Sequence, residues 1–406
     1  MEVLKERHDV LTFLEKVSAE QGIPKYTIID AATNEKGEGY LGQIFMITIK
    51  DDFSDKELRV VVKVAFVDEK IRKFVPIKKS FLNEIYFYQH IRPTFRKMEA
   101  NHNIEHTEFS PQCFKVLVEN EKEMLCLENL KTLKFEMFEK TSVLDDEHVS
   151  FIFKTYGRFH GYSFVLKDQQ PEVYKQLTSE IHNIYEEFVI NPEGNFKEYL
   201  TDLIADVRTY LLDKEDDVII SKFEKYADKG VLDCFYDITT QTCNYSSILH
   251  GDCWSNNMMF KYETSEDNRK LVDMRLLDFQ IVKVGSPVCD LSYCLYSGGS
   301  KGLFDNLEKY LKIYYESLEA TLKQFGSDAE VVFPFQALKE DWKKYARFGM
   351  IMSCCAIKIK CTNKDDILDL TDDFDVSKPI KVKFNEEEYG KRTKEILCHL
   401  CEIDAL

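Results

Sequence analysis

The pattern of apolar and polar residues divides the chain into a strand-rich beginning and a helical remainder. Short alternating runs, which are typical of half-buried strands, occur between residues 26 and 127. Beyond about residue 145, apolar residues recur every three to four positions, which is typical of helices that pack on a core. We therefore expect an α+β protein with a small sheet-containing beginning and a large, mainly helical end.

The boundaries of these elements follow from turn residues and changes of period. In the first part, strands are predicted at 26–32, 43–50, 58–66, 113–118 and 124–127, with helices at 1–21 and 78–91. Pro93 should help to end the second helix, because proline lacks a backbone donor. The second part should contain a short hairpin at 258–260 and 275–277, and helices that include 178–190, 196–213, 216–228, 231–243, 301–325, 335–358 and 385–402.

The stretch from His250 to Asp278 carries the most specific chemistry of the chain. It contains His250-Gly-Asp252, then Asn257 five residues later, then Asp278 followed by Phe-Gln. Phosphoryl transfer needs a carboxylate that accepts the proton of the attacking hydroxyl, and oxygen ligands that hold Mg²⁺ on the nucleotide phosphates. In the order used by protein kinases, Asp252 would be the catalytic base, and Asn257 and Asp278 the metal ligands. We expect His250 to orient the loop.

Two histidine and aspartate positions near this stretch have simpler interpretations. His160 lies on the apolar face of a predicted helix and is expected to be a packed or hydrogen-bonded core residue. Asp290 begins a predicted helix, where we expect it to cap the helix and to tether the catalytic loop.

A glycine pattern early in the chain suits phosphate binding. Gly37, Gly39 and Gly42 form G-x-G-x-x-G, and glycines let the backbone approach phosphate oxygens closely. A plain hairpin turn is the alternative. The run that follows is rich in strand-forming residues, which favours the kinase type of glycine loop over the dinucleotide-binding type, because the latter opens a helix.

A lysine and a glutamate complete the nucleotide half of the pattern. Lys63 stands within the apolar strand 58–66, either as an edge residue that faces solvent or as a lysine that contacts nucleotide phosphates. Glu84 lies beside the apolar stripe of the helix 78–91 and is its predicted partner; a solvated carboxylate is the alternative. The glycine pattern upstream favours the functional interpretation of Lys63.

The predicted strand 124–127 runs directly into Glu128-Asn-Leu130. In kinase-like folds the strand that leads into the hinge offers backbone groups to adenine, and we expect the backbone around Glu128 and Leu130 to do so. The boundary between two lobes should lie here, with residues 1–130 forming the nucleotide-binding lobe and residues 131–406 the helical lobe with the catalytic loop and acceptor site.

Composition and charge exclude several other classes of protein. The 406 residues carry a net charge of −17, which argues against a nucleic-acid binder or a protein of anionic membranes. No run approaches the roughly 20 apolar residues of a membrane span, and the N-terminus lacks the apolar core of a secretory signal. The 12 scattered cysteines are expected to be reduced thiols of a cytoplasmic protein, and no obligate protein partner is evident.

The motifs HGDCWSNN, LLDFQ and GSPVCDLSY resemble the ecdysteroid kinase-like family of insects, in the choline kinase and aminoglycoside phosphotransferase branch of the protein-kinase-like fold. VVVKVAF, FLNEIYFY and LCLENL are similar to its lysine strand, glutamate helix and hinge, so the resemblance covers nearly the whole chain. It implies a bilobal fold whose small N-lobe has an antiparallel sheet plus one helix. It also implies ATP- and Mg²⁺-dependent phosphorylation of a lipophilic alcohol, for characterised members the 22-hydroxyl of an ecdysteroid, with a role in detoxification for others.

Several alternatives stay beside this interpretation. Gln280 replaces the glycine of D-F-G and no A-P-E element follows, which argues against a protein kinase. An inactive relative that sequesters a lipophilic ligand is a further alternative, against which the intact motif residues argue. The 29 Phe and 21 Tyr residues suit an apolar acceptor pocket but would equally form a core. The acidic stretch 362–379 is interpreted as a solvated connection, or else as a cover of the acceptor site.

Overall fold

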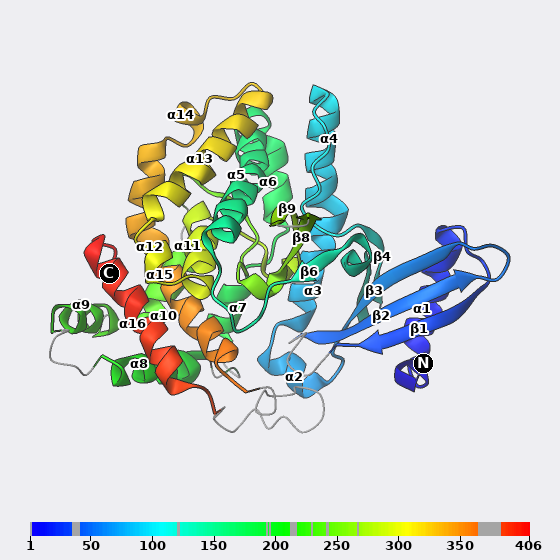
Figure 1. The fold of residues 1–406 in the computed structure, drawn as a ribbon, viewed down its shortest axis with the longest axis horizontal. Helices are drawn as coiled ribbons and strands as arrows, with labels where there is room; N and C mark the ends of the chain where they lie inside the picture. Colours follow the sequence, from blue (N-terminus) through cyan, green and yellow to red (C-terminus); the bar gives the residue numbers. More distant parts are fainter. Residues whose placement is uncertain are drawn as a thin grey trace.

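A computed structural model describes residues 2–34, 41–119, 122–191, 194, 196–211, 217–228, 230–240, 243–265, 268–363 and 383–406. It has the predicted α+β, bilobal, protein-kinase-like arrangement, with the sheet of the N-lobe at one end and a mainly helical C-lobe at the other (Figure 1). Among the described residues, no helix is long and apolar enough to cross a membrane.

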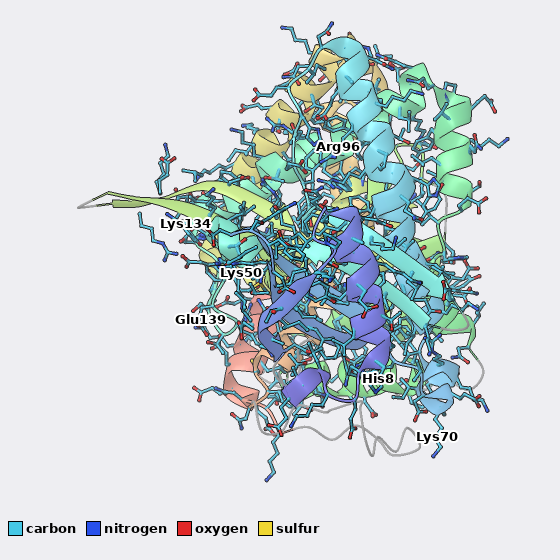
Figure 2. All side chains as sticks on the ribbon, turned by 90° about the vertical axis from the view of Figure 1, so that its right-hand side faces the viewer. His8, Lys50, Lys70, Arg96, Lys134 and Glu139 are labelled. Atoms are coloured by element: carbon cyan, nitrogen blue, oxygen red, sulfur yellow. The ribbon has the colours of Figure 1, made fainter. Side chains whose placement is uncertain are left out.

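The N-lobe is built on a five-stranded antiparallel sheet with the strand order β1-β2-β3-β5-β4. Its strands are β1 (Tyr26–Thr33), β2 (Gly42–Asp51), β3 (Glu57–Ala65), β4 (Cys113–Glu119) and β5 (Lys122–Glu128), which agree with the predicted runs. The 3-10 turn η1 (Glu2–Leu4) and helix α1 (His8–Glu20) precede them, and α1 lies across the outer face of the sheet (Figure 2).

Side-chain alternation along β3 determines what each face of the sheet contacts. Val60, Val62 and Val64 are buried in the small core under α1. Successive side chains of a strand point to opposite faces, so Lys63 faces the other side, toward the interior between the lobes. The pattern that makes β3 a strand therefore also places its one central lysine away from the apolar core.

A long helical run follows the sheet strands and differs from the prediction at its end. It comprises α2 (Glu69–Phe74), α3 (Ile77–Tyr86), the π-helical turn η2 (Phe87–Ile91) and α4 (Arg92–His102). The expectation that Pro93 ends the helix is wrong. Pro93 lies in the first turn of α4, after the wider π turn, where its missing N–H costs little. The implied N-lobe with one helix is therefore corrected: α1, α2 and α4 accompany α3, the helix that carries Glu84.

The C-lobe is mainly helical, with two small sheets, one that flanks the stretch from His250 to Asp278 and one that contains part of it. Strands β10 and β7 pair with each other, and β6, β8 and β9 form an antiparallel sheet in that order. The elements are η3 (Leu130–Leu133), β6 (Phe135–Met137), α5 (Asp146–Gln169), α6 (Pro171–Ser179), α7 (Ile184–Ile190), α8 (Phe196–Thr209), α9 (Asp217–Asp228), α10 (Val231–Thr240), β7 (Ser247–Leu249), η5 (Ser255–Asn257), β8 (Met258–Ser265), β9 (Asn268–Leu276), η6 (Phe279–Ile281), β10 (Lys283–Gly285), α11 (Pro287–Gly298), α12 (Lys301–Phe304), α13 (Leu307–Gln324), α14 (Ala329–Val332), α15 (Phe335–Lys360) and α16 (Glu386–Glu402).

Two predicted helices are interrupted, and the predicted hairpin is longer than expected. The helix 178–190 is divided between α6 and α7, because Asn183 caps α7 by accepting a hydrogen bond from the Glu186 N–H. The helix 301–325 is likewise divided into α12 and α13. Apolar periodicity does not register such a short break when the face toward the core continues across it.

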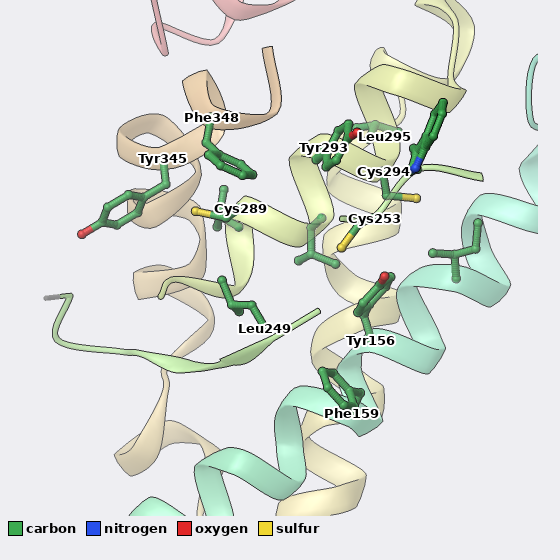
Figure 3. Packing of buried hydrophobic residues seen from close by; sticks show 14 of the residues in the cluster. Tyr156, Phe159, Leu249, Cys253, Cys289, Tyr293, Cys294, Leu295, Tyr345 and Phe348 are labelled. Carbon is green, nitrogen blue, oxygen red and sulfur yellow. The ribbon is translucent and has the colours of Figure 1, made fainter. Parts of the chain in front are cut away.

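One large core joins the two lobes. Phe81 and Ile85 of α3 belong to the same buried cluster as the helices of the C-lobe. Within the C-lobe, α5, α11 and α15 surround β7, whose Leu249 lies between Phe159 and Phe348 (Figure 3). The stretch from His250 to Asp278 therefore begins in the buried core of the C-lobe.

The close contact of α11 with α15 depends on Gly349. A Cβ on Gly349 would lie 2.4 Å from the Ser292 backbone carbon. We predict that Gly349→Ala lowers the free energy of unfolding by about 1–3 kcal/mol, because the helices must separate. Gly302→Ala, whose Cβ would meet nothing within 4 Å, is the matched control. Urea denaturation measures both, and equal stability of the two variants would contradict the prediction.

Candidate active site

The catalytic stretch begins with a backbone turn that requires glycine. Gly251 follows β7 with a φ of 87°, and a Cβ there would lie 2.0 Å from the Ile281 carbonyl oxygen. Both observations exclude a larger residue. The carbonyl oxygen of Gly251 accepts a hydrogen bond from the Tyr185 hydroxyl of α7 at 2.7 Å. The turn that carries Asp252 thus packs against the backbone of Ile281 and is hydrogen-bonded to Tyr185.

Asp290 of α11 holds this turn through its backbone. Its carboxylate accepts hydrogen bonds from the His250 N–H at 2.7 Å and the Gly251 N–H at 3.0 Å, and His160 Nε2 lies 3.2 Å away. Burial opposes the charge of Asp290, yet the hydrogen bond from His160 lowers its pKa below the usual value. Asp290 tethers the loop as expected, and His160 is fully buried as expected. The expectation that Asp290 caps the helix is wrong, because Ser286 is the N-cap.

The His250 ring links the turn to the strand that precedes Asp278. Its Nε2 donates to the Leu277 carbonyl oxygen at 2.8 Å, and its Nδ1 accepts from the Asp252 N–H at 3.2 Å. Burial lowers the pKa of His250, which favours the neutral ring that this pair of hydrogen bonds requires. Both ring nitrogens are engaged in holding the loop, so the geometry fits an orienting residue.

Asp252 is held at both carboxylate oxygens. Asn257 Nδ2 donates to Oδ2 at 2.7 Å, and the Tyr293 hydroxyl donates to Oδ1 at 3.2 Å. Burial, and then the nearby Asp278 carboxylate, raises the pKa of Asp252 to about 7, while these two hydrogen bonds oppose the shift. Sequence reasoning missed Tyr293. Its signal is the spacing from Asp290, since residues three apart on a helix share a face.

Lys63 lies between two carboxylates from different parts of the chain. Its Nζ is 2.5 Å from Glu84 Oε2 in α3 and 2.9 Å from Asp278 Oδ1. Lys63 is 8% exposed and Glu84 is fully buried, so neither is a solvated surface residue. Burial disfavours the charge of Lys63, but Asp278 and Glu84 raise its pKa, and it stays cationic. Burial also disfavours the charged form of Glu84 and raises its pKa, while the Lys63 ammonium group acts in the opposite direction.

The segment around Asp278 is anchored to the N-lobe helices. Asp278 has a φ of 66°, which is unusual for a residue other than glycine. Phe279 stacks on Phe87 with ring centroids 3.5 Å apart and planes within 5°. Asn83 of α3 donates to the His182 carbonyl oxygen and accepts from the His182 N–H at 2.8 and 2.9 Å. The helix that carries Glu84 is therefore fastened directly to the C-lobe.

The oxygen atoms of Asn257 and Asp278 fit the requirements of Mg²⁺. The Leu277 N–H donates to the Asn257 carbonyl oxygen at 2.8 Å, which brings Asp278 beside Asn257. The side-chain nitrogen of Asn257 donates to Asp252, so the amide oxygen is the side-chain atom that Asn257 can offer to a metal. Magnesium prefers oxygen ligands and usually takes one or two protein carboxylates together with substrate phosphates. An amide oxygen and a carboxylate are a donor set of this kind.

Only part of the predicted glycine loop falls within the described residues. Gly37 and Gly39 lie outside them. Gly42 is the first residue of β2 and pairs with Ala65, and a Cβ on it would lie 2.3 Å from the Val64 carbonyl oxygen. Close packing against β3 is therefore a sufficient reason for glycine at position 42. Most of the predicted acidic stretch, from residue 364 onward, also lies outside the described residues.

The predicted hinge follows the last strand of the sheet. The Glu128 N–H donates to the Gln112 carbonyl oxygen at 2.8 Å, so this donor is already engaged. Leu130 begins η3, a position whose N–H has no acceptor within its own turn, and its side chain is buried. Leu130 thus remains the candidate donor to adenine, with the carbonyl of Glu128 as the candidate acceptor.

Comparison with known proteins identifies a family. The model of the ecdysteroid kinase-like family matches residues 36–327, which is more than half of the chain. No curated protein matches. A GDP complex of an aminoglycoside 2'-phosphotransferase-IIIa mutant is 14% identical, with 85% of this chain and 96% of that chain covered and a TM-score of 0.40.

Two further solved structures show similar coverage. A putative fructosamine-3-kinase from Haemophilus somnus 129PT is 14% identical, with 85% of this chain and 96% of that chain covered and a TM-score of 0.33. A glucosamine kinase in complex with glucosamine, ADP and inorganic phosphate is 9% identical, with 82% of this chain and 94% of that chain covered and a TM-score of 0.23.

The Asp290 tether gives a prediction about stability. Asp290→Ala leaves the buried His250 and Gly251 N–H groups without an acceptor and should lower the free energy of unfolding by at least about 2 kcal/mol. Asp237→Ala, at an exposed position of α10, should change it by less than about 0.5 kcal/mol. Urea denaturation of the two variants tests this, and an Asp290→Ala protein as stable as the control would contradict it.

Proposed function

The chain belongs to the ecdysteroid kinase-like family, and from this premise we propose that it is an ATP- and Mg²⁺-dependent phosphotransferase that acts on a hydroxyl of a small lipophilic alcohol. An ecdysteroid, phosphorylated at its 22-hydroxyl, is the first candidate acceptor, and other lipophilic alcohols handled in detoxification are the next. The observation that carries the proposal is the buried Lys63 between Glu84 and Asp278, beside the Asp252–Asn257 pair.

Different residues of the N-lobe and the hinge bind the phosphates and the adenine of the nucleotide. Lys63 neutralises phosphate charge and is aligned by Glu84. The backbone at Glu128 and Leu130 binds adenine. Phosphate contacts are assigned to the glycine pattern Gly37, Gly39 and Gly42 from the sequence, since Gly37 and Gly39 lie outside the described residues and Gly42 opens β2. The boundary between the nucleotide-binding residues 1–130 and the helical residues 131–406 lies at this hinge, where the sheet ends.

The acceptor half is organised around Asp252. Its carboxylate accepts the proton of the acceptor hydroxyl as the hydroxyl oxygen attacks the γ-phosphorus and ADP leaves. Bound Mg²⁺, held by Asn257 and Asp278, would neutralise the charge that develops on the phosphates. Because Asn257 and Tyr293 fix both oxygens of Asp252, the base is oriented before the acceptor binds.

Aromatic residues beside the catalytic turn belong to the buried core of the C-lobe. Tyr185 and Tyr293 both reach the turn with their hydroxyls and pack against Phe348, with ring centroids 5.3 and 6.4 Å away. Phe235 lies against Phe348 in turn, at 5.9 Å. Phe235 and Phe348 are fully buried, so these rings support the turn from the core side, and the preference for a lipophilic acceptor rests on the family.

The cysteines and the Lys63 cluster bear on the cellular compartment and on the inactive alternative. All 12 cysteines are free thiols, which supports a reducing compartment such as the cytoplasm. A relative that only sequesters a ligand would not need Lys63 to be buried with two carboxylates, because such a cluster costs free energy. The intact cluster therefore supports catalysis.

The assignment of the base predicts the behaviour of Asp252→Asn. This variant should lose about 10²- to 10⁴-fold in transfer rate, because the amide accepts no proton, while nucleotide affinity is kept. Mass spectrometry of product after incubation with ATP, Mg²⁺ and a panel of ecdysteroids and other lipophilic alcohols measures transfer. The control is Asp273→Asn in β9, whose partly exposed carboxylate pairs with Arg275. Wild-type rates in Asp252→Asn would refute this assignment, and absence of product with every alcohol would refute the proposed substrate class.

The metal ligands predict a different effect for Asp278→Asn. Its affinity for ADP in the presence of Mg²⁺ should fall about tenfold or more, because one charged oxygen ligand is lost. Affinity without Mg²⁺ should change little, since Lys63 keeps Glu84 as its partner. Calorimetric titration with and without the metal measures both, with Asp273→Asn as the control again. An unchanged response to Mg²⁺ would argue against Asp278 as a ligand.

A further inference from the structure

Helix α11 supports the catalytic stretch at three successive levels. Asp290 binds the backbone of the turn, and Tyr293, one turn further along, binds the Asp252 carboxylate. At the third level, the Ser297 carbonyl oxygen accepts a hydrogen bond from Lys360 Nζ at 3.2 Å. The same nitrogen donates to Ser255 Oγ at 2.8 Å. The last residue of α15 is thus connected to the catalytic loop.

Lys360 occupies an unfavourable position for a lysine. It is 3% exposed, and both of its hydrogen-bond acceptors are neutral oxygens. Arg392 of α16 donates to the same Ser297 carbonyl oxygen at 2.8 Å, so two buried cations share one acceptor. Within the described part of the chain, neither has a carboxylate partner. Burial and the nearby Arg392 lower the pKa of Lys360 to about 7.

Capping of α11 does not by itself account for this lysine. The carbonyl groups in the last turn of a helix need donors, and a basic side chain commonly supplies one. Arg392 already does so at Ser297. The contact that Lys360 adds is the one with Ser255, which is 2% exposed and lies in the catalytic loop.

Ser255 is well placed to control the orientation of Asn257. It is the first residue of η5, the short turn that ends at Asn257, and the Asn257 N–H donates to the Trp254 carbonyl oxygen at 3.0 Å. A shift of Ser255 would therefore move the amide that orients Asp252 and offers its oxygen to the metal.

We propose that Lys360 is a positioning residue that holds Ser255, and through it Asn257, in the geometry needed for Mg²⁺-nucleotide binding. This inference rests on the proposed function, because it takes Asn257 to be a metal ligand. It gives the C-terminal helices a part in the active site. Lys360, which contacts Ser255, is the last residue of α15, and Arg392 of α16 donates to the same Ser297 carbonyl oxygen as Lys360.

Stability and function should respond in opposite ways to removal of this lysine. Methionine has a similar length and no charge, and replacing a buried charge that lacks a countercharge with an apolar residue is often neutral or stabilising. Loss of the hydrogen bond to Ser255 nevertheless frees the turn, and small displacements of positioned groups reduce binding and rate steeply. A residue with a purely structural role would show the reverse pattern.

The experiment compares Lys360→Met, Ser255→Ala and the double variant with Lys358→Met. Lys358 lies on the same helix and pairs with Asp206 at 2.5 Å, away from the loop, which makes it the matched control. The readouts are the melting temperature of the free protein and the affinity for ADP with and without Mg²⁺, neither of which requires an acceptor. We expect both single variants to lose about tenfold in Mg²⁺-dependent ADP affinity, with unchanged Mg²⁺-free affinity. Lys360→Met should keep its melting temperature, whereas Ser255→Ala should lower it, because Lys360 stays buried and loses one of its two acceptors.

The double variant should be no weaker than Lys360→Met alone, because both substitutions break the same contact. Wild-type Mg²⁺-dependent affinity in Lys360→Met and Ser255→Ala would overturn the inference while leaving the proposed function intact. Additive losses, or losses that are equal without Mg²⁺, would also overturn it. If Lys360→Met does not fold, Ser255→Ala decides alone. A wild-type protein that binds no Mg²⁺-nucleotide would refute the proposed function and this inference together.

Discussion

The ion pairs of Lys63 are the interaction on which the arrangement of the two lobes depends. One ammonium group joins Glu84, from a helix beside the sheet, to Asp278, from the end of a C-lobe strand. Buried charges of this kind contribute little net stability, because desolvation offsets their attraction. Their value lies in geometry, since one ammonium group fixes the positions of two carboxylates from different lobes. The stacking of Phe279 on Phe87 and the hydrogen bonds of Asn83 keep the same interface closed.

Helix α11 provides the second constraint, because it holds the catalytic loop along its length. Asp290 accepts hydrogen bonds from the backbone of the turn, Tyr293 donates to the Asp252 carboxylate, and the Ser297 carbonyl accepts from Lys360, which also contacts Ser255. The contact of α11 with α15 is close because Gly349 has no side chain. The loop thus inherits the rigidity of the helical core, as expected for a site that acts by positioning and charge neutralisation.

The order of motif residues allowed much of the candidate site to be predicted. Lys63, Glu84, Asp252, Asn257 and Asp278 were selected by residue type and spacing, and the structure brings the first two to Asp278 and joins the next two by a hydrogen bond. Their chemical roles remain proposals. Strands were predictable because alternation is a local signal, whereas the breaks between α6 and α7 and at α12 were not. The prediction that Pro93 ends the helix was wrong because the effect of a proline on a helix depends on the turn before it, and here that turn is a π turn.

The sequence by itself determined the fold class, the family and the chemistry-bearing residues, because periodicity, residue type and motif spacing are written along the chain. Tertiary structure alone decided which buried polar groups support those residues. Tyr293 lies 41 positions from Asp252, and Lys360 lies 105 positions from Ser255. The spacing of Tyr293 from Asp290 indicates a shared helix face but not the contact with Asp252, and no local pattern indicates the contact of Lys360 with Ser255. The free energy that selects them comes from burial, which exists only once the helices have packed.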